Sequence, residues 1–315
     1  MPPSGTQPSV RLRRIGSALR KAREASGMTI ETACRRYGRS KGWLSTLENG
    51  LHSIEPQELT DLLDFYGVPP GPLRESLLHL AARTNGKGWE RPYEGHISAA
   101  ALDFMSLEQD SVLIRNYEAC VVPGLMQTYD YARALFSLQL SETAKRTGAL
   151  LDFRMDRQRI MTGPHPPHFI SVISESVLFH EVGGPEVMLG QINRIAEMAR
   201  WSHVHLRIIP QEAGIYLGIA SPYVLLTLRP PGALTVSVLE QFAKSVFVDN
   251  EHQVAEHERA FEQLLEGALD EESSLALVEE LAAQQPASPR NVPRNRRHWR
   301  QQRRPSGQGQ SHHPR

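Results

Sequence analysis

The sequence predicts three regions in order: an all-α N-terminal domain, an α+β C-terminal domain, and a disordered basic C-terminal tail. A chain of 315 residues is long enough for about two domains. Up to Val68, apolar residues recur three or four positions apart, which is the period of amphipathic helices. Farther along the chain, runs rich in β-branched residues alternate with helical stretches, a pattern typical of an α+β domain.

Turn and capping residues divide the N-terminal domain, residues 11–70, into short helices. Thr29 and Ser40 can cap the second and third helices, because a hydroxyl oxygen accepts a hydrogen bond from a backbone N–H at a helix start. Pro56 suits the first turn of the fourth helix. The first three helices are expected to end at Gly27, at Gly38 and at the pair Asn49-Gly50.

The C-terminal domain is expected to span residues 97–283, after a helical linker over residues 71–96. Strands are predicted over residues 112–117, 169–174, 204–209, 223–228, 234–239 and 245–248. Helices are predicted over residues 129–139, 142–161, 185–200, 250–266 and 271–283, with Asp249 and Asp270 as caps of the last two. Residues 1–10 and 284–315 are expected to be disordered, since the tail contains five prolines and few apolar side chains.

Charge is distributed unevenly along a chain whose formal net charge is zero. Residues 1–50 hold ten Lys or Arg against three acids, and residues 284–315 hold eight Arg and no acid. The remaining residues carry a net charge of −15. Such a polarised chain can bind a polyanion at its basic ends, so nucleic-acid binding becomes a hypothesis. For the tail, nonspecific contact with phosphates and simple solvation are both open alternatives.

The second and third predicted helices, residues 29–37 and 40–49, are joined by a turn that contains Gly38. This pattern is typical of a helix-turn-helix, whose second helix lies in the major groove of DNA. Ala33, Leu44 and Leu47 fill the inward positions, and four residues of the second motif helix are left outward: Lys41, Gly42, Ser45 and Thr46. The alternative is a small helical bundle that has no DNA partner.

The stretch GRSKGWLSTLENG, residues 38–50, resembles the recognition-helix signature of the Cro/C1-type phage repressors and Xre regulators. The resemblance covers about residues 15–68. It implies base contacts from Lys41, Gly42 and Thr46, with Ser40, Ser45 and Asn49 near phosphates, and Thr29 completes the predicted DNA-binding set. Double-stranded DNA is the implied partner and a homodimer the implied assembly. The chain departs from the family at Ile30, where members often carry a Gln that bonds a phosphate.

Several stretches of the second domain resemble the large C-terminal domain of the antitoxin-like group of Xre regulators, over about residues 97–282. They are residues 121–133 (VVPGLMQTYDYAR), 157–158, 173–178, 182–188, 209–210, 223–226 and Glu240. The resemblance implies a small partner protein encoded nearby and assigns no molecular activity. The sequence therefore favours a sequence-specific DNA-binding transcriptional regulator. The alternative is an antitoxin-like interaction protein that uses DNA binding for autoregulation.

The sequence gives little support for an enzyme, a metal site or a cofactor, and we expect none of the three. His203 and His205 lie on one face of a predicted strand, but no carboxylate accompanies them at a diagnostic interval. Ser174 and Ser176 lack the flanking glycines of a nucleophile elbow. The glycine-containing stretches 183–186 and 214–218 lack the Gly-Lys-Ser/Thr ending of a phosphate loop.

Cysteine content and hydropathy predict a cytoplasmic protein. Only Cys34 and Cys120 are present, too few for a disulfide framework, and both are expected to be buried thiols. The N-terminus is polar and proline-rich, unlike a secretory signal. No stretch of about 18 apolar residues is available to span a membrane.

Overall fold

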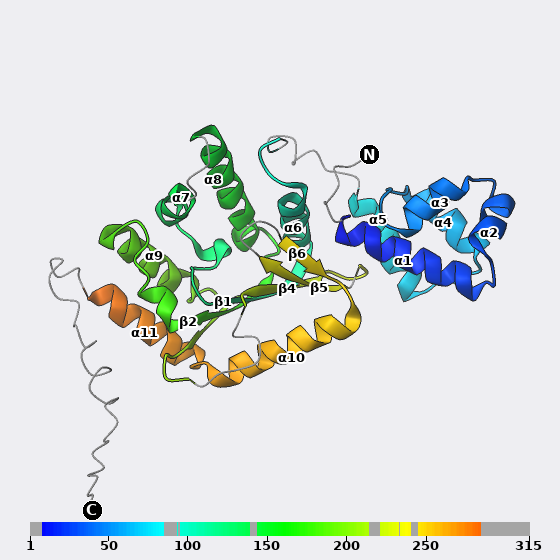
Figure 1. Cartoon of the computed structure of the whole chain (residues 1–315). Helices are drawn as coiled ribbons and strands as arrows, with labels where there is room; N and C mark the ends of the chain where they lie inside the picture. The colour runs from blue at the N-terminus through cyan, green and yellow to red at the C-terminus, as the bar shows by residue number, and fades with distance from the viewer. Residues whose placement is uncertain are drawn as a thin grey trace, which may run out of the picture.

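In the part of the chain that the structure describes, five helices form a bundle and six strands form one sheet (Figure 1). This computed structural model describes residues 8–84, 93, 95–138, 144–213, 221–232, 234–240 and 245–284. Nearly all of the predicted basic tail lies outside these ranges. Ser9 and Val10 lie in the segment that we expected to be disordered; Ser9 caps the first helix and Val10 begins it.

The N-terminal bundle confirms the predicted caps. The side chain of Thr29 accepts a hydrogen bond from the Thr32 N–H at 3.2 Å, and that of Ser40 accepts one from the Trp43 N–H at 3.1 Å. Gly38 ends its helix with a φ of 78°, a left-handed conformation that suits glycine. The bundle consists of α1 (Val10–Ala25), α2 (Ile30–Tyr37), α3 (Lys41–Glu48), α4 (Pro56–Phe65) and α5 (Pro72–Thr84).

Helices α1 and α3 approach each other at two glycines. A methyl carbon at Gly16 would lie 2.5 Å from the Leu47 carbonyl oxygen, and one at Gly50 would lie 2.8 Å from the Arg13 Cα. Gly50 also has a φ of 69°. Because any side chain at these positions would push the helices apart, the glycines set the spacing between α1 and α3.

The six strands form a single mixed sheet in the order β3-β2-β1-β4-β5-β6. Strands β1, β2 and β3 are parallel to one another, and the pairs β1–β4, β4–β5 and β5–β6 are antiparallel. The strand predictions are confirmed, with the fifth shifted by one residue. The bounds are β1 (Ser111–Glu118), β2 (His168–Ser174), β3 (Val204–Ile209), β4 (Tyr223–Leu228), β5 (Thr235–Glu240) and β6 (Ser245–Val248).

Helices cover both faces of the sheet (Figure 1). On one face lie α6 (Ala99–Gln109), α7 (Tyr129–Ser137), α8 (Ala144–Gln158) and α9 (Pro185–Met198), with the short 3-10 helices η2 (Gly124–Met126), η3 (Arg159–Thr162) and η4 (Glu175–Leu178). Helix α10 (Glu251–Gly267) runs along the other face, and α11 (Glu271–Ala283) packs beside α9 and β3. No helix of the described ranges combines the length and the apolar character needed to cross a bilayer.

Several elements differ from the expectations in detail. Helix α6 was not predicted, and the helix predicted over residues 142–161 ends as an α-helix at Gln158 and continues as the 3-10 helix η3. Asn250, and not Asp249, caps α10, because its side chain accepts the N–H groups of His252 and Gln253. Cys34 is buried as expected, but Cys120 is exposed, since it lies in the bend that follows β1.

The bundle and the sheet domain share one apolar core, because α5 packs against both. Helix α5 falls within the segment that we expected to be a linker, and it also packs on α1 and α4. The turn after β4 comes close to it, since a methyl carbon at Gly232 would lie 2.7 Å from the His79 ring. This shared core includes Val10, Leu77, Leu80 and Ala81 from the bundle and Phe104, Leu107, Leu228 and Leu234 from the sheet domain.

Arginines of α1 bind carboxylates of the C-terminal domain along this junction. Arg11 is 2% exposed and bonds the Ser106 hydroxyl at 3.0 Å and Asp110 at 2.7 Å. Arg13 pairs with Asp249 at 3.2 Å. This ion pair occupies the carboxylate that we expected to cap α10.

Candidate nucleic-acid interface

Helices α2 and α3 pack as the inward residues of the motif predict. Ala33, Leu44 and Leu47 are 0%, 2% and 1% exposed, so all three belong to the core of the bundle. Burial of two leucines on one side of an eight-residue helix fixes which side of α3 faces away from the protein. In Figure 1, α2 lies at the end of the bundle remote from the sheet, and α3 lies between α2 and α5 in this view.

The outward side of α3 is polar. Lys41, Gly42, Thr46 and Asn49 are exposed, and Ser45 is half-buried. The Thr46 hydroxyl donates to the Trp43 carbonyl oxygen at 2.9 Å. The structure therefore places these predicted residues on one surface.

The other two predicted residues, Thr29 and Ser40, are exposed at the starts of α2 and α3. Their hydroxyl oxygens accept the capping hydrogen bonds described above, and the Ser40 carbonyl oxygen lies 3.5 Å from the Cys34 thiol. Both hydroxyls thus have a structural role, and the Thr29 hydroxyl also shares a hydrogen bond of 3.0 Å with the Thr32 hydroxyl.

Lys41 forms an ion pair with Glu31 of α2. The hydrogen bond between them lowers the pKa of the Glu31 carboxyl and raises the pKa of the Lys41 amine, so both groups stay charged at neutral pH. The two side chains are 64% and 55% exposed, and such a pair is weak in water. Lys41 can therefore exchange Glu31 for another anion at little cost.

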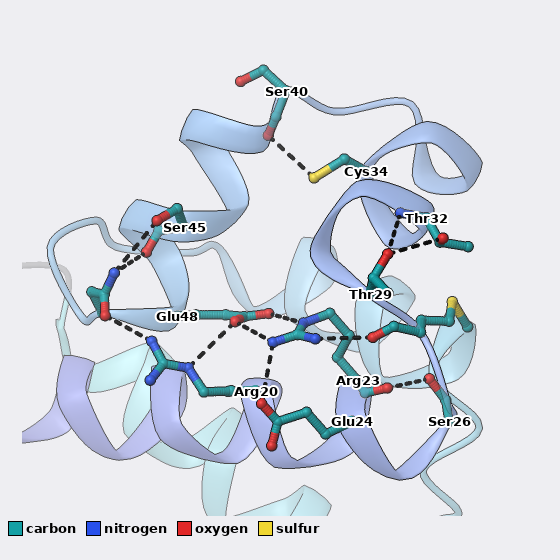
Figure 2. A network of polar contacts seen from close by, with 12 residues as sticks. Arg20, Arg23, Glu24, Ser26, Thr29, Thr32, Cys34, Ser40, Ser45 and Glu48 are labelled. Atoms are coloured by element: carbon teal, nitrogen blue, oxygen red, sulfur yellow. Dashed lines mark hydrogen bonds and ion pairs between the residues drawn. The ribbon is translucent and has the colours of Figure 1, made fainter.

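Glu48, the residue that precedes Asn49-Gly50, is a structural residue. Its carboxylate receives hydrogen bonds from the Arg23 Nε and Nη2 at 2.6 and 2.9 Å, as Figure 2 shows. Arg20 approaches the same carboxylate at 3.4 Å and bonds the Asn49 side-chain oxygen at 2.7 Å. Glu48 is 5% exposed, and its hydrogen bond raises the pKa of Arg23. This buried pair joins α1 to the end of α3.

An aromatic cluster supports the start of α3. The rings of Tyr37 and Trp43 stack with centroids 6.3 Å apart, and Phe65 of α4 packs on Tyr37 at 5.2 Å. The Arg39 guanidinium lies 5.2 Å from the centroid of the Trp43 ring. Arg39, in the turn of the motif, thus packs on Trp43 and also forms an ion pair with Glu58 of α4.

Three exposed arginines near α3 were missed as site residues by the sequence analysis: Arg35, Arg36 and Arg39. They lie at the end of α2 and in the turn. All three are among the ten basic residues counted in the first 50 positions, but such a count does not show which side of a helix carries a charge.

The structure shows what surrounds two unusual residues of the motif, Ile30 and Gly42. Ile30, at the position where the resemblance to Cro/C1-type regulators implies Gln, is half-buried and packs against the core. Gly42 is exposed, and a methyl carbon there would have no neighbour closer than the Ser40 hydroxyl at 4.0 Å. The protein's own packing therefore does not require a glycine at position 42.

In the C-terminal domain, two glutamines hold the segment between β1 and α7. The Gln158 side chain donates to the carbonyl oxygens of Gly124 and Gln127, both at 2.8 Å. The Gln191 side chain donates to Met126 O at 2.8 Å and accepts the Thr128 N–H at 2.7 Å. Residues 121–133 and 157–158, two of the stretches that carry the resemblance of this domain, thus meet at one place, where Gln191 of α9 also contacts the first of them.

A buried carboxyl lies next to that segment. Glu118 ends β1, is 8% exposed, and lines a small cavity with Glu240 and Arg157. Burial raises the pKa of Glu118 to about 8, and the neighbouring Glu240 carboxylate adds to the rise. Glu118 therefore holds its proton at neutral pH, since its pKa lies above 7.

The histidines of the sheet domain have protein partners. His205 bonds Glu271 at 3.0 Å, and the rings of His168 and His205 stack 6.3 Å apart. Within the described ranges, His, Cys, Asp and Glu form no group of three that could hold a metal ion.

Comparison with known protein families finds two matches. Residues 14–77 match a family described as helix-turn-helix domain, and residues 101–280 match a family described as domain of unknown function (DUF5753). A search of the curated proteins and a search of the solved structures found no match. The first match covers the five-helix bundle almost completely, and the second covers the sheet with its helices.

Proposed function

Because the chain belongs to the DUF5753 family and begins with a helix-turn-helix domain, we propose that it is a sequence-specific transcriptional regulator of the Cro/C1-type Xre group. A helix-turn-helix domain indicates a DNA-binding regulator, and double-stranded DNA is its partner. The observation that carries the more specific proposal is the surface of α3. One side is buried in the bundle, while the other is polar and exposed.

We assign the contacts according to position on this surface. Lys41 and Thr46 reach base edges, and Gly42 lets the backbone of α3 come close to the DNA. Phosphate contacts come from the residues around them: Thr29, Ser40, Ser45, Asn49, Arg35, Arg36 and Arg39. The arginines supply the sequence-independent part of the affinity, which weakens as salt concentration rises.

The test is a comparison of alanine variants on an operator found by genome-wide mapping of bound DNA. Lys41→Ala and Thr46→Ala are expected to lose about 1–3 kcal/mol of specific binding each while keeping the stability of the fold. Lys21→Ala removes the same charge from the groove between α1 and α10 and is expected to bind normally. Equal affinity of all three variants and the unchanged protein for the operator would reject the assignment.

Leu47→Ala serves as the structural counterpart. It is expected to cost about 2–5 kcal/mol of folding free energy, because it opens a cavity in the core. Its loss of DNA binding should therefore follow its loss of structure in circular dichroism, whereas that of Lys41→Ala should not.

We further propose that the protein binds DNA as a homodimer, since one recognition helix offers few base contacts. Operators are then inverted repeats with half-sites about one helical turn, roughly 10 bp, apart. Sedimentation of the protein with operator DNA tests this assembly; a complex that contains only one protein chain would contradict it.

A second candidate function concerns the C-terminal domain. In this proposal the domain is antitoxin-like and binds a small partner protein, with DNA binding used for autoregulation. It is supported by three large apolar side chains exposed on α7 and beside η4: Tyr129 at 49%, Phe179 at 55% and Leu138 at 70%. Co-expression with the products of neighbouring genes tests it. Neither proposal includes a catalytic step.

The arginine-rich tail adds nonspecific phosphate contacts in this proposal. Each phosphate that it neutralises adds about 0.9 to the slope of log affinity against log salt. Truncation after Ala283 is therefore expected to flatten the salt dependence on operator and random DNA alike and to leave sequence preference unchanged. An unchanged slope rejects tail contact, and tighter binding after truncation indicates that the tail inhibits the protein.

A further inference from the structure

A cavity of about 630 Å³ lies where the bundle meets the sheet domain. Its wall includes Arg83 of α5, Asp110 at the end of α6, Arg159 of η3 and Arg229 after β4. The size falls within the roughly 300–1,000 Å³ of pockets that hold small molecules. Both domains contribute to it, and it lies outside the α2–α3 surface.

The carboxylates of the cavity already have partners inside the protein. Asp110 accepts hydrogen bonds from Arg11 at 2.7 Å and pairs with Arg83 at 2.9 Å. Asp156 accepts a hydrogen bond from the Tyr93 hydroxyl and pairs with Arg159 at 2.9 Å. The wall therefore holds three guanidinium groups against two carboxylates, each of which is shared between two donors.

Among the arginines of the wall, Arg229 is the one whose positive charge is least compensated by a carboxylate. Its Nη2 contacts the His165 carbonyl oxygen at 3.4 Å, a long hydrogen bond. Among the described residues no carboxylate pairs with it. Arg159 is 80% exposed, and its i,i+3 pair with Asp156 is therefore weak. Both arginines can receive an anion without losing a strong contact.

Apolar and aromatic residues make up much of the rest of the wall, beside the polar residues Gln109 and His165. Met105, Ile160, Pro164 and Pro167 line the cavity together with Tyr93. Apolar walls with a few convergent charged groups are typical of sites for small organic ligands. Arginine binds carboxylates and phosphates through two parallel hydrogen bonds, and this geometry selects an anionic group.

We propose that this cavity is a binding site for a small organic anion, whose carboxylate or phosphate is held by Arg159 and Arg229 and whose carbon skeleton packs on the apolar wall. Arg83 brings α5 of the DNA-binding bundle into the same site. A ligand here contacts both domains and stabilises the junction between them. The inference goes beyond DNA binding, and its test needs no DNA.

Isothermal titration calorimetry of the full chain tests the proposal with two probes. Citrate represents carboxylates and adenosine monophosphate represents phosphates; adenosine, which lacks the phosphate, is the neutral control. We expect saturable binding of citrate or of adenosine monophosphate at one site per chain, and no binding of adenosine. The probe that binds identifies which anionic group the site prefers.

Two variants locate the site. Arg159→Gln and Arg229→Gln are each expected to weaken binding of the probe at least about tenfold, since each removes a charge-assisted hydrogen bond. Arg133→Gln is the matched control, because Arg133 is also exposed and forms an i,i+3 pair, with Asp130 at 3.0 Å, on α7. Circular dichroism melting checks that all three variants fold. The proposal is overturned if neither probe binds at millimolar concentration, or if all three variants bind equally well.

Discussion

The Arg11 guanidinium of α1 donates to the Asp110 carboxylate at the end of α6 over 2.7 Å, across 99 positions of sequence. The other oxygen of the same carboxylate lies 2.9 Å from the Arg83 Nη1 of α5. Asp110 thus joins two helices of the DNA-binding bundle to the sheet domain. Its backbone carbonyl oxygen also accepts the Arg229 N–H at 2.8 Å. One residue therefore connects the bundle, the sheet and the wall of the anion cavity.

Asp110→Asn is expected to destabilise the chain by about 3–5 kcal/mol, because it removes the carboxylate that the buried Arg11 guanidinium bonds at 2.7 Å and leaves it only Asp103, at 3.8 Å. Urea unfolding measures the loss. Asp130→Asn on α7 is the control, since its pair with Arg133 is exposed, and it should change stability by less than about 1 kcal/mol. A loss of equal size in both variants would mean that the buried Arg11–Asp110 pair contributes no more to stability than the exposed Arg133–Asp130 pair.

Gly42→Ala separates stability from recognition. It is expected to raise the free energy of unfolding by about 1 kcal/mol, because alanine favours a helix and the site is open. Operator affinity should nevertheless fall if the DNA backbone or a base comes close to α3 there. Gly190→Ala, at an equally open position in α9, should give the stability gain without the loss of affinity. Tighter operator binding by Gly42→Ala would contradict the close approach.

Glu31→Gln is expected to tighten operator binding about threefold, within the range of an exposed ion pair, because it frees Lys41 and removes a negative charge near the phosphates. Fluorescence anisotropy with labelled operator measures the change. Glu75→Gln changes the charge equally on α5 and should have a smaller effect. If both variants bind more tightly by the same factor, the gain comes from net charge alone.

The raised pKa of Glu118 predicts how the free energy of unfolding depends on pH. Its folded pKa of about 8 lies above the model-compound value of 4.5, so the native state binds one more proton than the unfolded state between these values. Stability from this group is therefore full below pH 4.5 and is lost as the pH rises towards 8, by up to about 1.4 kcal/mol per pH unit. Glu118→Gln should flatten this slope in urea unfolding, whereas Glu262→Gln, exposed on α10, should retain it.

Local patterns in the sequence predicted the elements with clear local causes. Thr29 and Ser40 mark helix starts because a cap needs only neighbouring backbone, and β4 was predicted because its residues are apolar and β-branched. Helix α6 escaped prediction because it packs against both the bundle and the sheet. Its buried residues, Phe104, Met105, Leu107 and Glu108, therefore do not form one apolar stripe.

The long-range contacts had no local signature. Many carboxylates could have paired with Arg11 or Arg13, and only the folded chain selects Asp110 and Asp249. The same holds for Glu48, whose partner Arg23 lies 25 positions earlier in the sequence, on α1. The surface of α3 was predictable because its inward leucines determine its outward side. The anion cavity was not, since its arginines come from separate elements.

Helix α3 is held close to the backbone of α1 at Gly16 and Gly50. This contact means that two properties of an operator, its base preference and the spacing of its half-sites, depend on different parts of the protein. In the proposed function, exposed side chains of α3 decide which bases are preferred, and they can change without moving the helix. The distance between half-sites depends instead on how far apart two such helices are held in a dimer. Because α3 is fixed to α1 and α1 is fixed to the sheet domain, that distance is determined by the surfaces through which two chains associate. Evolution can therefore alter base preference and half-site spacing independently, through different parts of the chain.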